Sequence, residues 1–448
     1  MTRAAPPGRI RAMRALILYV CALVFVGRAA SAHQDALERR AREVAAIIAA
    51  EPKWADDLFD KAFLKEVPPA RLRAIGLQYF AQCGEVTDVR LQERKTEHSA
   101  VFEMTFAKDQ VATLTLGLGA AAPNSVVMLF FGVPTQALSD WPAVIEAFQK
   151  LPGSSNFAVW KLGAEKPEVL AAHEADRALA IGSAFKLYVL GALVDEIAAG
   201  KRKLSDVVTL DARSRSLPSG VLHAWPLGTP VTLASLAVGM ISISDNTATD
   251  HLMAALSRDR VEAQLAKMGN ENAARSLPFL HTHELFRLKA ARNAGAVAEY
   301  LKLDLPGKRA FLAKEVAAWP LDESIFDGGF LTRPSYIEEL EWFASAADLC
   351  RAMDWLRKAT ESGPASSLRE VLAINRGLSV STRAFPWAGF KGGSEPGVLD
   401  FTFLLRAADG SWYALSAAWN DPSAAVDEVQ FAGLVQRAIV ILGGKPAK

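Results

Sequence analysis

A serine and a lysine three residues apart open an apolar segment of the chain, Ile181-Gly182-Ser183-Ala184-Phe185-Lys186. On a helix, this spacing places Ser183 and Lys186 on one face, one turn apart. A serine hydroxyl is a weak nucleophile at neutral pH and needs a base in contact with it. A partly desolvated, deprotonated lysine can be that base. The pair therefore predicts nucleophilic catalysis by Ser183, with a helix N-cap and a solvated lysine as the alternative.

Two further polar stretches could complete such a site. In Ser242-Ile243-Ser244-Asp245-Asn246-Thr247-Ala248, the hydroxyl of Ser244 could relay a proton to a leaving nitrogen. The amide of Asn246 could contact a substrate carbonyl and Lys186. In Phe390-Lys391-Gly392-Gly393-Ser394, which is predicted to lie just before a strand, a lysine that can anchor a carboxylate adjoins glycines that allow close backbone approach. A helix cap and a plain hairpin turn are the respective alternatives.

The order of these stretches, a Ser-x-x-Lys helix, a Ser-Asp-Asn loop and then a Lys-Gly strand, resembles that of the penicillin-recognising serine hydrolases. The class A β-lactamases are the most similar members, over about residues 155–445. The resemblance implies that Ser183 is the acylated nucleophile, that Lys186 is its base partner and that Ser244 acts in catalysis beside them. It also implies oxyanion-hole N–H groups from Ser183 and Ser394. The implied substrate-binding residues are Asn246, Lys391, Gly393 and Ser394.

Two positions depart from the family pattern. The family's Lys-Thr/Ser-Gly is Lys391-Gly392-Gly393 here, which removes a hydroxyl that helps to hold a substrate carboxylate. Either Ser394 partly replaces it, or the substrate lacks a carboxylate there. The candidate for the deacylating glutamate is Glu284, although the family's following Leu-Asn pair is not reproduced. Glu284 is therefore predicted as the general base that activates the hydrolytic water, with a structural carboxylate as the alternative.

His281 and His283 form an H-x-H pair, a pattern that binds zinc in another β-lactamase class. No aspartate-histidine continuation follows the pair, and a serine mechanism already accounts for the motifs. We therefore expect no metal and no other cofactor.

The elements that must position these residues divide the chain into three parts. Residues 1–32 predict a signal peptide. Residues 33–150 predict helices and then four strands, a smaller N-terminal α+β domain similar to the SnoaL-like fold, ending in a linking helix over 140–151. Residues 151–448 predict a β-lactamase/transpeptidase-like serine hydrolase domain, in which an antiparallel sheet is flanked by helices and joined to an all-helical part. The fold class is therefore α+β.

The N-terminal segment predicts export. Its uncharged run Ala15–Gly27 is shorter than the roughly 20 residues of a membrane-spanning helix, and all five charges of residues 1–32 are arginines. Ala30-Ser31-Ala32 is suited to signal cleavage, with a membrane anchor or a buried helix as the alternative. We expect a periplasmic or secreted protein that has no membrane association after cleavage.

The charge balance, 50 basic against 49 acidic residues, gives no electrostatic footprint for nucleic acid. We expect a monomer that acts on a small molecule. The leading function is a serine hydrolase that opens β-lactam amides through an acyl-serine, as in β-lactam catabolism and antibiotic resistance. An esterase or peptidase on the same fold, and a β-lactam-binding or sensing protein without turnover, are the alternatives.

Overall fold

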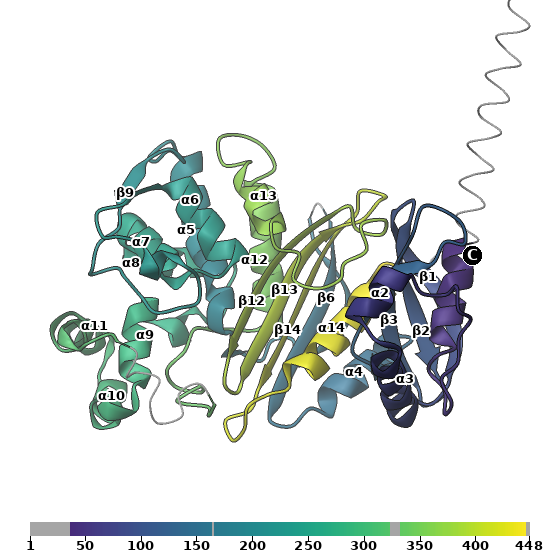
Figure 1. Cartoon of the computed structure of the whole chain (residues 1–448). Coiled ribbons are helices and arrows are strands. Elements are labelled where there is room, and N and C mark those ends of the chain that lie inside the picture. Colours follow the sequence, from purple (N-terminus) through teal and green to yellow (C-terminus); the bar gives the residue numbers. More distant parts are fainter. Residues whose placement is uncertain (1–35, 164, 323–331, 445–448) are drawn as a thin grey trace, which may run out of the picture. The chain divides into compact units, whose positions relative to one another are not determined.

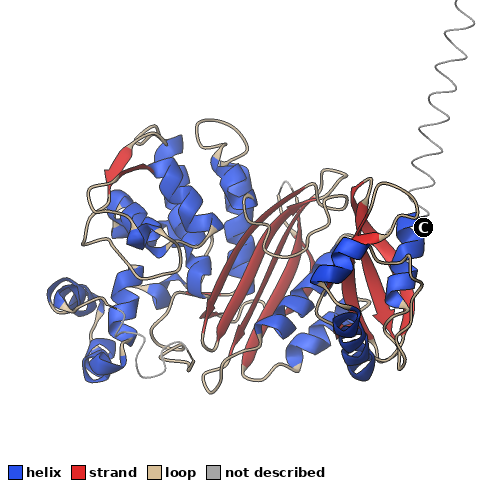
Figure 2. Cartoon of the chain, in the orientation of Figure 1, coloured by secondary structure: helices blue, strands red, loops and turns tan. Residues whose placement is uncertain are grey.

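The computed structural model describes residues 36–163, 165–322 and 332–444, so the predicted signal peptide lies outside the described residues. The chain divides into two compact units between Ala137 and Leu138. We call the part before this boundary unit 1 and the part after it unit 2. Figure 1 colours the elements along the chain, and Figure 2 distinguishes helices from strands.

Unit 1 packs helices against an antiparallel sheet of order β1-β2-β3-β4, with β5 paired to β3. Inward residues of the strands, among them Phe102 and Leu114, share a core with Leu37 and Val44 of the first helix. This is the predicted succession of helices and a four-strand meander, whereas the likeness to the SnoaL-like fold stays a prediction. The elements are a helix over residues 36–45, α2 (Lys61–Glu66), α3 (Pro69–Cys83), β1 (Val86–Thr96), β2 (Ser99–Phe106), β3 (Gln110–Leu118), β4 (Val126–Phe131) and β5 (Thr135–Gln136).

Unit 2 is built on an antiparallel sheet of order β12-β13-β14-β6-β7, in which its first strand, β6, pairs with its last, β14. The strands and short bridging strands are β6 (Ser154–Leu162), β7 (Glu168–His173), β8 (Leu179–Ala180), β9 (Val207–Thr209), β10 (Pro230–Thr232), β11 (Phe343–Ala344), β12 (Trp387–Glu395), β13 (Val398–Arg406) and β14 (Trp412–Asn420). The helices are α4 (Trp141–Gln149), α5 (Lys186–Ala198), α6 (Leu233–Ser242), α7 (Asn246–Leu256), α8 (Arg258–Lys267), α9 (Thr282–Lys289), α10 (Ala294–Lys302), α11 (Leu305–Lys314), α12 (Ala346–Ala359), α13 (Leu368–Ala373) and α14 (Glu428–Leu442), with short 3-10 turns at Gly182–Phe185 (η1), Leu222–Ala224 (η2), Ala273–Ser276 (η3), Ala291–Asn293 (η4) and Val316–Ala318 (η5).

The two faces of the unit 2 sheet bury different cores. Phe157 and Phe403 point to the face that α4 and α14 cover, whereas Trp160 and Leu404 point to the face that meets the helical part around α5 and α12. Alternation along a strand produces this division, because successive side chains project from opposite faces. The α+β fold of a β-lactamase/transpeptidase-like domain is thus confirmed, with its sheet, its flanking helices and its separate helical part.

The helix predicted as a linker belongs to unit 2. Phe148 of α4 stacks on Phe157 of β6 with ring centroids 4.7 Å apart, and Val144 lies in the same core. The unit boundary therefore falls before this helix, 13 residues earlier than the predicted end of the first domain at residue 150. The apolar face of α4 decides this, since it is buried against the sheet of unit 2 rather than spanning solvent.

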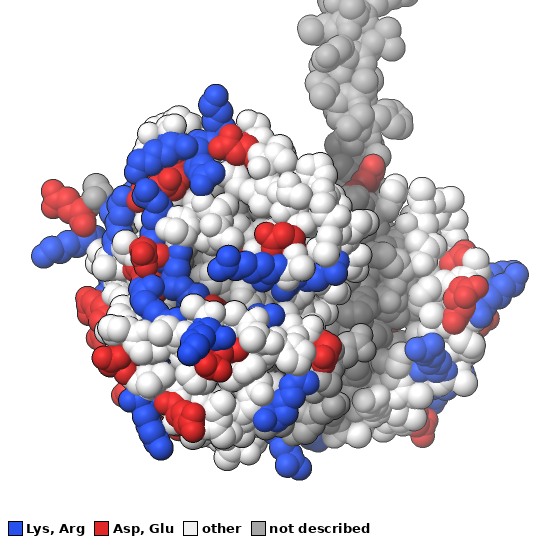
Figure 3. Space-filling model, turned by 90° about the vertical axis from the view of Figure 1, so that its left-hand side faces the viewer, with Lys and Arg blue, Asp and Glu red and all other residues white. Residues whose placement is uncertain are grey.

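Basic and acidic side chains lie among one another on the face of the molecule shown in Figure 3. Within the described ranges, no helix is both long enough and apolar enough to cross a bilayer. The two cysteines of these ranges, Cys83 and Cys350, are buried free thiols.

Candidate active site

Ser183 lies in the 3-10 turn η1, and Lys186 begins the following helix α5. The apolar sequence of α5 buries it almost completely, and Phe185 is stacked on Trp342 with ring centroids 3.7 Å apart. This packing fixes the direction of the turn and places the Lys186 side chain inside the protein, with none of its surface exposed. The predicted Ser-x-x-Lys pair is therefore a contact, with Lys186 Nζ 3.1 Å from Ser183 Oγ.

Lys186 Nζ has four oxygen neighbours. Besides Ser183 Oγ, these are Asn246 Oδ1 at 2.6 Å, the carbonyl oxygen of Ser244 at 2.7 Å and Ser244 Oγ at 3.0 Å. Burial lowers the pKa of Lys186 well below its usual value, and the charge of Lys391 lowers it further. A neutral amine has two N–H groups and one lone pair. The carbonyl of Ser244 and the amide oxygen of Asn246 can only accept, so the two N–H groups serve them and the lone pair is left for a hydroxyl.

Ser244 reaches this position through a left-handed backbone conformation, with φ of 57°. Such a conformation costs a non-glycine residue roughly 1–3 kcal/mol and persists only where the surroundings impose it. Here the next residue, Asp245, accepts hydrogen bonds from the N–H groups of Val221, Leu222 and Ala248. Asp245 thus caps α7 and holds the loop in position. The predicted helix cap is Asp245, and the residue that contacts the lysines is its neighbour Ser244.

Lys391 approaches Ser244 from the opposite side. It lies within β12 itself rather than before a strand as predicted, and its Nζ is 3.0 Å from Ser244 Oγ and 2.5 Å from the carbonyl oxygen of Gly392. Burial lowers the pKa of Lys391 to about 7, against the opposing effect of Asp400. The hydroxyl of Ser244 therefore joins two buried amines.

Backbone contact between η1 and β12 depends on two glycines. A Cβ on Gly393 would lie 2.0 Å from the carbonyl oxygen of Ile181 and 2.6 Å from the nitrogen of Ser183. Gly182 has φ of 46°, and a Cβ there would lie 3.2 Å from the nitrogen of Ser394. The absence of side chains at Gly182 and Gly393 therefore lets the backbones of η1 and β12 approach closely beside Ser183 and Ser394.

The missing hydroxyl at Gly392 has a steric explanation. A Cβ at this position would lie 2.8 Å from the ring of Phe390 and 3.1 Å from the carbonyl oxygen of Asp400. Phe390 packs on Phe403 with centroids 4.7 Å apart, which holds its ring in place. Ser394, the possible substitute, is exposed.

Glu284 is in the first turn of α9, and bonds unrelated to Ser183 occupy both of its carboxylate oxygens. Arg258 lies 2.7 Å from Oε1, and the N–H of His281 donates to Oε2 at 2.8 Å. Although burial acts to raise it, the pKa of Glu284 is lowered by nearby His281 and by Arg258. A carboxylate that is so well satisfied is a weak base, and the geometry therefore favours the structural alternative for Glu284.

Ser183, Lys186, Ser244, Asn246 and Lys391 thus form one connected cluster, and Gly393 and Ser394 border it. Sequence inspection missed Asp250, which is four residues after Asn246 on α7 and groups with His281 and His283. Among the described residues, these three side chains offer ligand atoms close enough for one metal ion. The only sequence signal for Asp250 was its helical spacing from Asn246.

The sheet, the helical part and the lysine-centred cluster define a hydrolase-type domain of the β-lactamase/transpeptidase class. The beta-lactamase enzyme family matches residues 142–303, which lie within unit 2 and include Ser183 to Asn246. Over these residues unit 2 is similar to the beta-lactamase enzyme family.

Solved structures similar to this chain include β-lactamases and a penicillin-binding protein. The β-lactamase from Sphaerobacter thermophilus DSM 20745 is 21% identical, with a TM-score of 0.48, over 68% of this chain and 98% of the other. The β-lactamase from Chitinophaga pinensis DSM 2588 is 15% identical, with a TM-score of 0.46, over 67% and 97%. PBP-A is 14% identical, with a TM-score of 0.43, over 66% and 94%. No curated protein matches the chain.

Proposed function

We propose that unit 2 is a serine hydrolase that opens the amide of β-lactams through an acyl intermediate on Ser183. The observation that carries the proposal is the contact of Lys186 Nζ with Ser183 Oγ at 3.1 Å, made by a lysine with no exposed surface and a lowered pKa. A neutral amine held against a hydroxyl is the arrangement that nucleophilic attack at neutral pH needs.

In the acylation step, Lys186 Nζ takes the proton of Ser183 Oγ while this oxygen bonds to the substrate carbonyl carbon. The N–H groups of Ser183 and Ser394 stabilise the negative charge on the carbonyl oxygen. The C–N bond of the amide then breaks, and the leaving nitrogen receives a proton through Ser244 Oγ. This hydroxyl supports such a relay because it lies 3.0 Å from Lys186 Nζ and 3.0 Å from Lys391 Nζ.

Lys391 is proposed as the anchor for an anionic group of the substrate. With a pKa of about 7, it is charged in roughly half of the molecules at neutral pH before substrate binds. A bound carboxylate favours the charged form, so binding draws a proton to Lys391. The amide oxygen of Asn246 accepts a hydrogen bond from Lys186 Nζ at 2.6 Å, which holds this amine beside Ser183.

A second candidate is a protein that acylates and releases its product slowly. It is favoured by Glu284, whose two oxygens are engaged by Arg258 and by the N–H of His281. If Glu284 does not activate water and no other base replaces it, the acyl-enzyme would persist. An esterase or peptidase has no comparable support, since no contact of the cluster selects an ester or a peptide.

Intact-mass spectrometry after mixing the protein with a penicillin and with a cephalosporin tests the proposal. We expect an adduct of the drug's mass on the wild type and on Ser205→Ala, an exposed serine that serves as the control, and none on Ser183→Ala. An adduct on Ser183→Ala would remove Ser183 from its role. The decay of the wild-type adduct distinguishes a β-lactamase, which loses it within seconds, from a slowly releasing protein.

We also propose export to the periplasm or the medium. The support is the sequence of residues 1–32 alone, with its arginines, its apolar run and Ala30-Ser31-Ala32. Fractionation of cells that express the chain, with N-terminal sequencing of the product, tests this, and we expect a mature N-terminus at His33.

A further inference from the structure

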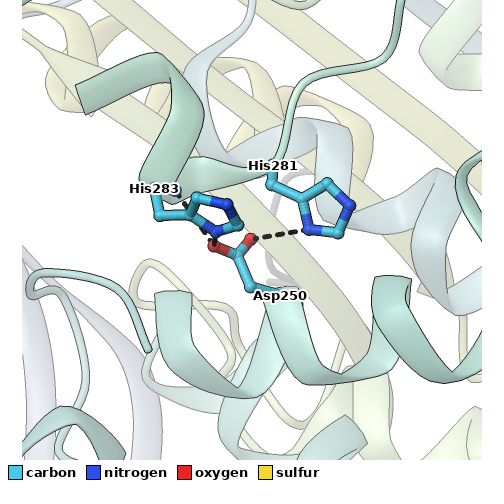
Figure 4. A group of neighbouring side chains, drawn as sticks. All are labelled: Asp250, His281 and His283. Carbon is cyan, nitrogen blue, oxygen red and sulfur yellow. Dashed lines mark hydrogen bonds and ion pairs between the residues drawn. The ribbon is translucent and has the colours of Figure 1, made fainter. Parts of the chain in front are cut away.

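Asp250, His281 and His283 form a compact group at the junction of α7 and α9. Asp250 lies on α7, whereas His281 directly precedes α9 and His283 is in its first turn. Figure 4 shows both imidazole rings beside the carboxylate of Asp250. One potential ligand atom from each residue lies within 4.8 Å of the others.

The carboxylate of Asp250 is fully buried, and several hydrogen bonds hold it in place. Oδ1 accepts the N–H of Thr282 at 2.8 Å, and Oδ2 accepts the hydroxyl of Thr282 at 2.9 Å and the N–H of His283 at 3.0 Å. Hydrogen bonds of this kind fix a carboxylate that binds a metal and orient its lone pairs.

The two histidines present the same ring atom to this carboxylate. His283 Nδ1 lies 2.8 Å from Oδ2, a hydrogen bond, whereas His281 Nδ1 lies 3.9 Å from Oδ1, which is too far for one. His281 Nδ1 is buried and makes no hydrogen bond within the described part of the chain. A buried ring nitrogen of this kind is costly unless something binds it.

One cation could bind both His281 and Asp250. With metal–ligand bonds of about 2.1 Å, two donors on the same ion can be up to about 4.2 Å apart, which includes the 3.9 Å between His281 Nδ1 and Asp250 Oδ1. His283 would exchange its hydrogen bond for ligation, with its ring proton on Nε2. The side chains of His281 and His283 are 13% and 11% exposed, so neither ring is sealed completely from solvent.

We infer that Asp250, His281 and His283 bind a divalent transition cation of the Zn²⁺ class. Two imidazoles and one carboxylate are the donor set that such ions take from proteins. The ion connects the start of α9 to α7, four residues beyond Asn246. The inference goes beyond the proposed function, because acylation of Ser183 requires no metal.

Calorimetric titration of the EDTA-treated protein with Zn²⁺ tests this site. We expect one saturable site per chain, and loss of affinity by more than about 100-fold in His281→Ala and in His283→Gln, because each removes a ligand. His173→Ala removes a histidine of β7 and serves as the matched control, with affinity within about twofold of the wild type. In thermal unfolding, Zn²⁺ should raise the Tm of the wild type and of His173→Ala but not that of His281→Ala.

His281→Ala removes a ring whose Nδ1 makes no hydrogen bond among the described residues, although the side chain also belongs to the capping box of α9. Its Tm without metal checks that the variant folds, and the Co²⁺ complex, with its visible absorption, gives the same comparison for His283→Gln. Absence of saturable Zn²⁺ binding by the wild type, or equal binding by His281→Ala, would overturn the inference. Ser183→Ala should bind Zn²⁺ as the wild type does, which separates this result from a failure of the proposed function.

Discussion

A single methyl group at position 393 should disable acylation. In Gly393→Ala, the new Cβ would lie 2.0 Å from the carbonyl oxygen of Ile181, 2.6 Å from the nitrogen of Ser183 and 2.9 Å from that of Ala184. All three atoms belong to the backbone, so no side chain can rotate away. Contact distances of about 3.2 Å or more require η1 and β12 to separate by about 1 Å, and a displacement of that size at reacting groups costs on the order of 100-fold in rate.

The assay for Gly393→Ala is the second-order rate of acylation, followed by intact mass with a penicillin. Overpacking should also lower the free energy of unfolding by about 1–3 kcal/mol, which denaturant titration measures. Gly295→Ala is the matched control, because nothing lies within 4 Å of a Cβ there and α10 accepts alanine readily. If folded Gly393→Ala acylates as fast as Gly295→Ala, the close backbone approach is not what builds the oxyanion hole.

Three further predictions concern the residues around this contact. Arg258→Met leaves the charge of Glu284 without its partner at 2.7 Å and should lower the free energy of unfolding by about 3 kcal/mol. Glu284→Gln should leave the lifetime of the acyl adduct unchanged. A longer adduct lifetime in Glu284→Gln would restore this residue as the general base. The pKa of Lys391 is about 7 in the folded protein and about 10.4 in the unfolded chain, so the unfolded chain binds the extra proton between these values. The free energy of unfolding should therefore rise with pH over that window, and Lys391→Met should reduce the slope, as chemical denaturation at several pH values would measure. Gly392→Thr should destabilise the protein because its Cβ would lie 2.8 Å from the ring of Phe390. Adding Phe390→Leu to this variant should recover stability and lower KM for anionic substrates. An unchanged Tm in Gly392→Thr alone would contradict the steric account.

Periodicity in the sequence was sufficient for most of the fold. Strands such as β6 and β14 alternate between two buried faces and were visible as short apolar runs, and α5 was visible as an uninterrupted apolar helix. The assignment of α4 was not predictable in this way. Its burial against Phe157 depends on tertiary packing, and a helix between two domains has the same local pattern whichever sheet it covers.

Motif order was sufficient to group Ser183, Lys186, Ser244, Asn246 and Lys391, because family spacing records which loops meet. Motif order could not predict contacts between segments that belong to no common motif. Arg258 is 26 residues before Glu284, and their ion pair changes the expected role of that carboxylate. Similarly, the H-x-H pair gave no reason to look 31 residues back to Asp250, and the ring that fills the space beside Gly392 could not be predicted from the residue type of Phe390.

The shared hydroxyl of Ser244 suggests how substrate binding and base strength are connected. Lys186 and Lys391 each approach Ser244 Oγ to 3.0 Å, and both are buried. The charge of Lys391 lowers the pKa of Lys186, so a proton held by Lys391 disfavours one on Lys186. A substrate carboxylate stabilises the proton on Lys391. It partly screens that charge from Lys186, but burial, the larger cause of the lowered pKa, remains. Burial therefore favours a neutral Lys186, the state that can accept the proton of Ser183.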